Sequence, residues 1–208
     1  MVDLNESKKL LVVRNELINC ATKHPLFLNV KKTNGHIVFG RGSDEAKVLF
    51  IGEAPGFTEN TIGKPFVGRS GKLLEEWVKE VGLTQSDYAI MNVVPIIPLS
   101  EENKIRPPTP QEINYFLPQT MKMVNTINPS VIVLLGKSAA RAFGKENMRV
   151  GESVLHEGKK MFFIYHPAYY LRNGKKGFED LTNLKKIISE NKNSKQTSLN
   201  NFKTNQNE

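Results

Sequence analysis

The stretch KVLFIGEAPG, residues 47–56, joins a short apolar run to a loop rich in glycine and proline. An unbroken apolar run of this length is typical of a strand that is buried on both faces, as in a parallel sheet. Three more runs of the same kind follow at residues 88–94 (YAIMNVV), 130–136 (SVIVLLG) and 160–165 (KMFFIY). The sequence therefore predicts a central four-stranded sheet that is mainly parallel.

Helical patterns lie between and after these runs. Residues 70–83 (SGKLLEEWVKEVGL) place apolar side chains on one helical face, and residues 109–127 begin with a capping box. Shorter helical patterns cover residues 137–143 and 178–190. Strands that alternate with helices need crossover connections, so the expected fold is α/β, a three-layer α/β/α sandwich.

Residues with chemical capacity fall where the predicted strands end. In a parallel sheet covered by helices, ligands bind beyond the carboxyl ends of the strands. GEAPG (52–56) follows the first strand, Asn92 lies near the end of the second, and Gly136 follows the third. His166 follows the fourth strand and precedes Pro167, which restrains the histidine to an extended conformation at a loop entrance.

The length and composition predict one domain and a tail. A chain of 208 residues is long enough for one well-buried core, and the polar sequence after residue 190 has too few apolar residues to fold alone. We therefore expect one domain over residues 1–190 and a flexible tail over residues 191–208. No apolar run approaches the ~20 residues that span a bilayer, and the N-terminus is typical of an amphipathic helix and not of a signal peptide. These features predict an intracellular protein, cytoplasmic or, in a eukaryote, nuclear, with no membrane partner. We also expect a monomer.

Missing residues exclude several classes of chemistry. Gly136 opens a Gly-Lys-Ser sequence, but a phosphate-binding loop needs a second glycine where Val131 stands. No Gly-x-Ser-x-Gly turn is present, which excludes the common hydrolase triad. Cys20 is the single cysteine, and none of the four histidines is spaced from another ligand as metal sites require. The sequence therefore predicts no catalytic metal.

The charge of the chain favours a polyanionic partner. The net charge is +8 and the pI is about 9.5. Between residues 172 and 203, eight Lys or Arg stand against three acidic residues. Charge alone is equally compatible with a solvated basic face and with a nucleic-acid contact.

Five segments, in this order and spacing, resemble the motifs of the uracil-DNA glycosylase superfamily, and most closely its family four, the thermophile type. They are GEAPGFTENTIGKPFVGRSGKLL (52–74), MNVV (91–94), RPPTPQEI (106–113), PSVIVLLGKSAARAF (129–143) and HPAYYLRN (166–173). The resemblance extends over about residues 15–190. It implies a monofunctional repair enzyme that flips uracil out of DNA, hydrolyses its N-glycosidic bond and leaves an abasic site in base excision repair.

The resemblance implies roles for residues of a uracil pocket. Phe66 is similar to the ring on which the flipped uracil stacks, and Asn92 to the amide that hydrogen-bonds uracil N3 and O4. His166 matches the histidine near uracil O2, where negative charge develops as the base leaves. The backbone of the first loop is expected to border the base, at Gly52, Ala54, Pro55 and Gly56.

The role of two carboxylates stays open. Ala54 stands where family-one enzymes have an aspartate that orients water, so the chain resembles family four in lacking this base. Glu53 or Glu59 is expected to position water or to offset the positive charge that develops on the sugar. The sequence does not decide between the two.

The resemblance also implies contacts with the DNA backbone. Leu171 is similar to the apolar side chain that fills the hole left by a flipped base, and Arg172 to a cation that holds a neighbouring phosphate. The amides of GRSG (68–71) are expected to bind phosphates at a helix N-terminus. The full expected set is Lys64, Gly68, Arg69, Ser70, Gly71, Leu171 and Arg172.

The chain departs from the resembled family, whose members carry a [4Fe-4S] cluster on four cysteines. Aligning the motifs places these ligands at Cys20, Lys23, Ile96 and Phe116, of which only the first is a cysteine. We therefore expect no iron-sulfur cluster and no other cofactor. Apolar packing, with Ile97 added, is expected to close this region instead.

The tail predicts a second partner beside uracil-containing DNA, which can be single- or double-stranded. Gln196, Leu199 and Phe202 have the spacing of a box that binds the sliding clamp PCNA, although Lys203 replaces the last aromatic residue of that box. Clamps of this kind imply an archaeal or eukaryote-like host.

Two alternative functions stay open. A protein of the same fold can bind DNA or act in processivity without catalysis, although such a module needs none of Phe66, Asn92 and His166. A glycosylase can also act on another base, such as hypoxanthine or mismatched thymine. Gly56 stands where family-one enzymes use a ring to exclude the thymine methyl group, so discrimination against thymine does not follow from the sequence.

Overall fold

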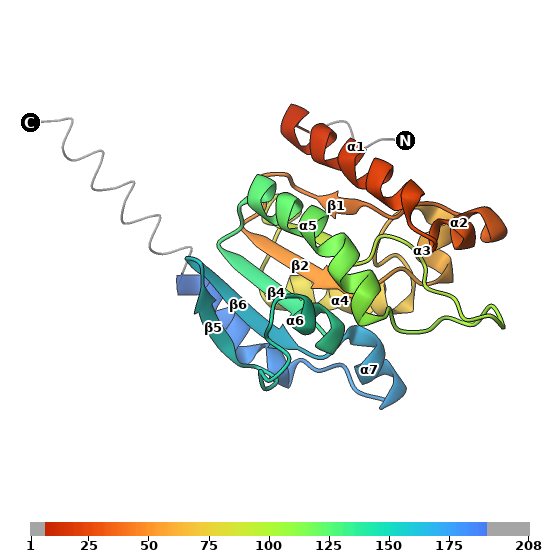
Figure 1. Cartoon of the computed structure of the whole chain (residues 1–208). Coiled ribbons are helices and arrows are strands. Elements are labelled where there is room, and N and C mark those ends of the chain that lie inside the picture. The colour runs from red at the N-terminus through yellow and green to blue at the C-terminus, as the bar shows by residue number, and fades with distance from the viewer. Residues whose placement is uncertain (1–6, 191–208) are drawn as a thin grey trace, which may run out of the picture.

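The computed structural model describes residues 7–190, which form a six-stranded sheet with helices on both faces (Figure 1). The strand order is β1-β3-β2-β4-β6-β5. The four central strands are parallel: β3 (Tyr88–Asn92), β2 (Val48–Gly52), β4 (Val131–Leu135) and β6 (Lys159–Ile164). They are the four runs that the sequence predicts, and β2, β3 and β4 are buried along their whole length.

Two short antiparallel strands extend the sheet beyond the four predicted strands. β1 (Gly40–Gly42) pairs with β3, and β5 (Ser153–His156) pairs with β6. Neither of them contains a fully buried residue. Because an edge strand is only partly covered, it lacks the continuous apolar run that marks a central strand. The predicted sheet is therefore the parallel centre of a larger mixed sheet.

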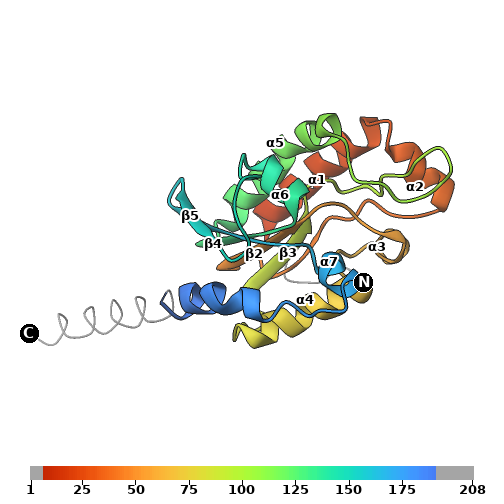
Figure 2. The ribbon, with the colours of Figure 1, turned by 90° about the horizontal axis from the view of Figure 1, so that it is seen from below.

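Helices cover the two faces as the predicted three-layer sandwich requires, and Figure 2 shows the layers. One face carries α1 (Lys8–Lys23), α5 (Pro110–Ile127) and α6 (Lys137–Ala142). The other face carries α4 (Arg69–Glu80) and a helix over residues 182–190. Each layer buries one apolar stripe against the sheet, so the molecule has two cores with the sheet between them.

The sequence explains where α4 and α5 begin and which sides they bury. Thr109 and Glu112 form the predicted capping box of α5, with both reciprocal hydrogen bonds present. Trp77 of α4 is fully buried, and its Nε1 donates to the carbonyl oxygen of Lys176 (2.6 Å). The apolar face of α4 lies inside as expected, with buried Leu73, Leu74, Trp77 and Val78.

Three short helices complete the described part: α2 (Phe27–Thr33), α3 (Phe57–Ile62) and α7 (Pro167–Arg172). A 3₁₀ turn, η1 (Glu179–Leu181), precedes the last helix. Helices α3 and α7 follow the carboxyl ends of β2 and β6, where a ligand is expected. None of the helices within residues 7–190 is long and apolar enough to cross a membrane. The predicted tail, with Gln196, Leu199 and Phe202, lies outside the described residues.

Candidate active site

The ends of three parallel strands bring the predicted pocket residues together. Gly52 ends β2 and is paired in register with Asn92, which ends β3. A Cβ atom on Gly52 would lie 2.5 Å from Phe66 Cζ and 2.5 Å from Asn92 Oδ1. Side-chain carbons essentially never approach other atoms so closely, so only glycine lets the ring and the amide border this strand end together.

Phe66 forms a buried wall of this site. Its side chain is 5% exposed, and its ring centroid lies 5.4 Å from that of His166, with the planes tilted by 33°. Phe66 has a φ of +53°, in the left-handed region that bulky residues rarely adopt. A Cβ on Gly71 would lie 1.9 Å from the Phe66 carbonyl oxygen, so this turn also requires glycine. Strain of this kind is typical of positions that a functional site holds in place.

Asn92 carries an unsatisfied acceptor in the same place. Its side chain is 4% exposed, and Oδ1 has no hydrogen-bond partner within residues 7–190. Leaving a buried polar group unpaired costs about 1–3 kcal/mol. The amide therefore suits a ligand that presents an N–H group beside Phe66.

His166 caps α7 in a neutral form. Its Nδ1 accepts a hydrogen bond from the amide of Ala168 (3.2 Å), which places the ring proton on Nε2. Burial lowers the pKa of His166 to about 4, and the charge of Arg172 acts in the same direction. At neutral pH the ring is therefore a neutral donor through Nε2. Gly136, with a φ of +91°, leaves room for it, because a Cβ there would lie 3.1 Å from His166 Cβ.

Glu53 is held by a residue that the sequence did not single out as a site residue. Ser138, in the first turn of α6, donates from Oγ to Glu53 Oε2 (2.7 Å). Burial raises the pKa of Glu53, whereas the Ser138 hydrogen bond and the Arg172 charge lower it. The structure thus places a partly desolvated carboxylate between α6 and α7.

Glu59 has a different environment. Its Oε1 accepts hydrogen bonds from the backbone amides of Val67 (3.0 Å) and Gly68 (2.7 Å). These amides directly follow Phe66 in the chain. The carboxylate therefore ties α3 to the turn that carries the ring.

Arg41 holds the same turn from the other side, and the sequence did not mark this residue. From β1, its Nε donates to the carbonyl oxygen of Pro65 (2.9 Å) and its Nη2 to that of Phe66 (3.3 Å). Arg41 also forms an ion pair with Glu75, which accepts a hydrogen bond from the hydroxyl of Tyr88 (3.0 Å). We call Arg41 and Glu59 the turn clamp.

The expected DNA contacts differ in exposure: Arg69 and Arg172 are exposed and Gly71 is buried, and the others, Lys64, Gly68, Ser70 and Leu171, are partly buried. Gly68 is the N-cap of α4 and its amide already donates to Glu59, whereas the first-turn amides of Arg69 and Ser70 have no acceptor within the helix. Arg172 is exposed at the end of α7, whereas Leu171 is partly buried and packs against the core. In the basic C-terminal stretch, two lysines pair with acids of α4: Lys176 with Glu76 (2.7 Å) and Lys185 with Glu80 (3.0 Å).

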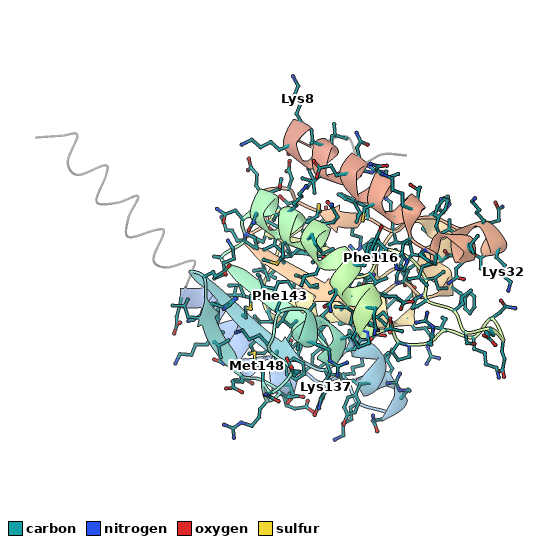
Figure 3. All side chains as sticks on the ribbon, viewed as in Figure 1. Lys8, Lys32, Phe116, Lys137, Phe143 and Met148 are labelled. Atoms are coloured by element: carbon teal, nitrogen blue, oxygen red, sulfur yellow. The ribbon has the colours of Figure 1, made fainter. Side chains whose placement is uncertain are left out.

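The residues at the four aligned cluster positions do not fit a [4Fe-4S] group. Ile96 and Phe116 are fully buried at 0% exposure, and Cys20 supplies the only thiol (Phe116 is labelled in Figure 3). The ring of His24 packs on Tyr115 and Phe116, with centroids 4.5 and 5.0 Å away. No group of three or more His, Cys, Asp or Glu within the described residues is arranged to hold a metal ion.

Comparison with known proteins identifies a matching family and similar proteins. The family model described as the uracil DNA glycosylase superfamily matches residues 39–190. The type-4 uracil-DNA glycosylase of Thermotoga maritima is 37% identical over 175 residues, which cover 80% of this chain and 85% of that protein. The type-4 uracil-DNA glycosylase of Archaeoglobus fulgidus is 35% identical, over 76% of this chain and 84% of that protein. The one of Saccharolobus solfataricus is also 35% identical, over 82% of this chain and 83% of that protein.

Proposed function

The chain belongs to the uracil-DNA glycosylase superfamily, and from this premise we propose how its residues excise uracil from DNA. The reaction is the hydrolysis of an N-glycosyl bond, with water as the nucleophile and an abasic site as the product. Such an enzyme extrudes the damaged nucleotide, stacks the base, reads its edge and stabilises the charge that develops as the bond breaks.

The Oδ1 of Asn92, which has no hydrogen-bond partner within residues 7–190, is the observation that carries this function. Uracil presents an N3–H donor next to the O4 acceptor, so one amide both accepts from N3 and donates to O4. Cytosine has no hydrogen at N3 and carries an amino group at C4, which reverses both positions. With Phe66 as the stacking surface, the pocket favours uracil over cytosine.

His166 supports the departure of the base. When the bond between C1′ and N1 breaks, its electron pair goes to uracil, and much of the charge develops on O2. The neutral ring donates through Nε2, since Nδ1 is occupied by the Ala168 amide. A donor already oriented stabilises the transition state more than the ground state.

We assign different roles to the two carboxylates. Glu53 is partly desolvated and held by Ser138, which suits a group that positions water or offsets positive charge on the sugar. One carboxylate oxygen of Glu59 accepts hydrogen bonds from two backbone amides, which suits a residue that fixes the Phe66 turn. Its effect on the reaction is then indirect.

The DNA backbone is proposed to run along the rim of the site. The first-turn amides of α4, with Lys64 and Arg69, suit the phosphates on one side, and Arg172 suits a phosphate on the other. Leu171 is proposed to fill the space left by the flipped base. Because it is partly buried, α7 must shift or the side chain must rotate for Leu171 to do so.

Excision assays test the function directly. The purified protein is mixed with single- and double-stranded oligonucleotides that carry uracil, thymine, hypoxanthine or xanthine, and abasic sites are cleaved with alkali. We expect uracil to be released fastest. Faster release of hypoxanthine or thymine would identify a changed base specificity, and DNA binding without release of any base would identify a non-catalytic protein.

We further propose that the protein acts without an iron-sulfur cluster or any other cofactor, and as a monomer. The support is the packing at the aligned ligand positions, where isoleucine and phenylalanine are fully buried. Metal analysis of protein purified without oxygen is expected to find iron far below one atom per chain. Near-stoichiometric iron with visible absorbance would contradict the proposal.

A further inference from the structure

A groove of about 600 Å³ is lined in part by α7, the helix that His166 caps. Residues from α6, the segment that follows it, the end of β6, α7 and η1 line this groove. Lys137 and Met148, two of the lining residues, are labelled in Figure 3. Its volume is in the range of sites that bind small molecules of nucleotide size.

Two tyrosines form an aromatic wall of the groove. The rings of Tyr165 and Tyr169 lie 4.4 Å apart, tilted by 43°, and Tyr169 remains 41% exposed. Tyr169 also packs edge-on against the buried ring of Tyr170 (5.5 Å, 87°), whose hydroxyl donates to Asp180 (2.6 Å). The exposed ring is therefore fixed before any ligand arrives, and such a ring is a suitable stacking platform for a base.

Charged side chains of both signs line the groove, with three cations and three carboxylates. The lining side chains of Lys137, Arg149 and Lys175 form no ion pair or hydrogen bond with any residue in 7–190. The lining also includes Glu146, Glu179 and Asp180. Their carboxylates repel a phosphate but accept hydrogen bonds from the amino groups of bases. Cations and carboxylates together suit a nucleotide better than a bare anion.

The groove continues the proposed DNA path. Tyr165 directly precedes His166, and the amide of Tyr169 donates to the His166 carbonyl oxygen (2.8 Å). One helical turn thus separates the ring of His166 from the exposed tyrosine. On this turn the most exposed aromatic side chain is Tyr169, whereas Leu171 is partly buried.

We propose that this groove is a second nucleobase subsite, which stacks an unpaired base next to the flipped uracil on Tyr169. This inference rests on the proposed function and specifies its substrate. In duplex DNA the neighbouring base is paired and stacked, so occupation of the groove costs unpairing, whereas in single-stranded DNA the base is free. The subsite therefore makes single-stranded DNA the preferred substrate.

The test is a cycle that combines protein variants with modified DNA. Single-stranded oligonucleotides carry one uracil and a base-free tetrahydrofuran residue at each flanking position in turn. For the wild-type protein, removal of the base at one flanking position should raise KM by about five- to hundred-fold and change kcat little. Tyr169→Ala should raise KM for the intact oligonucleotide by a similar factor. The KM of this variant should not change further when the flanking base is missing.

Two controls separate stacking from a merely structural role. Tyr169→Phe keeps the ring and should retain the wild-type KM, while Tyr115→Ala removes an exposed tyrosine of α5 outside the groove and should leave KM unchanged. The inference is overturned if Tyr169→Ala excises uracil with the wild-type KM. It is also overturned if the increase in KM from Tyr169→Ala adds to the increase caused by removal of the flanking base. If Tyr169→Ala changes the sedimentation coefficient relative to the wild-type protein but leaves KM unchanged, a second copy of the chain occupies the groove. Absence of excision by the wild-type protein is a separate result and contradicts the proposed function.

Discussion

At the scale of single residues, the site depends on positions where only one side chain is physically acceptable. Gly52 borders both Phe66 and Asn92, and Gly71 lies directly below the Phe66 carbonyl. A Cβ atom added at either glycine would lie too close to these groups, and Phe66 itself has a positive φ. The loop is therefore poor in bulky side chains because its backbone lies against the Phe66 ring and the Asn92 amide.

The first prediction concerns His166. His166→Ala should slow excision by about 10²–10³-fold, because the site loses the donor that faces the developing charge. His166→Asn should be nearly as slow, although asparagine retains a cap for α7. Single-turnover rates measure the effect, and thermal unfolding of the asparagine variant shows whether the fold is intact. A fully active His166→Ala variant would refute the role of the Nε2 donor.

The second prediction concerns the pH dependence that Glu53 imposes. Because burial raises its pKa above the ordinary value of 4.5, the carboxylate protonates earlier as pH falls. Excision should therefore decline on the acid side with a midpoint above 4.5, before His166 becomes protonated near pH 4. Rates measured across the acid range, on stable protein, give this midpoint.

Two variants identify the group responsible for this midpoint. Ser138→Ala removes a hydrogen bond that lowers the Glu53 pKa, so the midpoint should move to higher pH. Glu53→Gln should remove the decline of the rate on the acid side and should slow the reaction at neutral pH. If the wild-type protein, Ser138→Ala and Glu53→Gln all show the same midpoint, another group controls the decline of the rate at acid pH.

At the scale of elements, an edge strand and a short helix hold one turn between them. Arg41 from β1 binds the carbonyls of Pro65 and Phe66, and Glu59 from α3 binds the next two amides. The turn clamp therefore supports a backbone conformation that Phe66 would not adopt readily alone. Sheet and helix together position the ring of Phe66.

The third prediction concerns the turn clamp. Arg41→Gln should lower the free energy of unfolding by about 1–3 kcal/mol and should weaken substrate binding, because Glu75 loses its partner and the Phe66 turn loosens. Arg41→Lys should recover only part of the loss, because one ammonium group cannot reproduce the forked contact. Chemical denaturation and KM measure the two effects.

The surface pair Lys104–Glu102 provides a matched control. Lys104 also pairs with a carboxylate, but its side chain is 78% exposed, so Lys104→Gln should change stability by less than about 0.5 kcal/mol. Equal losses for Arg41→Gln and Lys104→Gln would contradict the turn clamp. Glu59→Gln, which keeps one acceptor oxygen, should slow excision much less than His166→Ala.

At the scale of the whole molecule, the sheet gathers residues from all parts of the chain at one edge. The register that pairs Gly52 with Asn92, and Leu135 with Ile164, aligns the ends of the four central strands. The loops that follow them carry Glu53, Gly136 and His166. A parallel sheet therefore builds the site from segments far apart in sequence.

The fourth prediction concerns the tail. Deletion of residues 191–208 should abolish binding to a PCNA clamp, since it removes Gln196, Leu199 and Phe202. Excision from short oligonucleotides should stay at the full rate, because the proposed site lies within residues 7–190. Calorimetry with the clamp and excision assays measure the two properties. Clamp binding that survives the deletion would place the contact elsewhere.

Much of the architecture follows from local sequence. Apolar runs such as VIVLL mark strands buried on both faces, and Thr109 with Glu112 marks the start of α5, because burial and capping depend on near neighbours in the chain. Those patterns predicted the parallel centre and the three layers. The edge strands β1 and β5 were not predicted, because their pairing depends on a sheet already formed.

The sequence by itself determined the family and the parallel core, and it predicted Phe66, Asn92 and His166 as site residues, since all of these depend on residue type and spacing. Only the tertiary structure decided which atoms meet. It placed Ser138 on Glu53, and Arg41 and Glu59 on the Phe66 turn, and it opened a groove beside Tyr169. The physical reason is that hydrogen bonds and burial join residues distant in the chain, whose approach depends on sheet register and helix packing and not on local pattern.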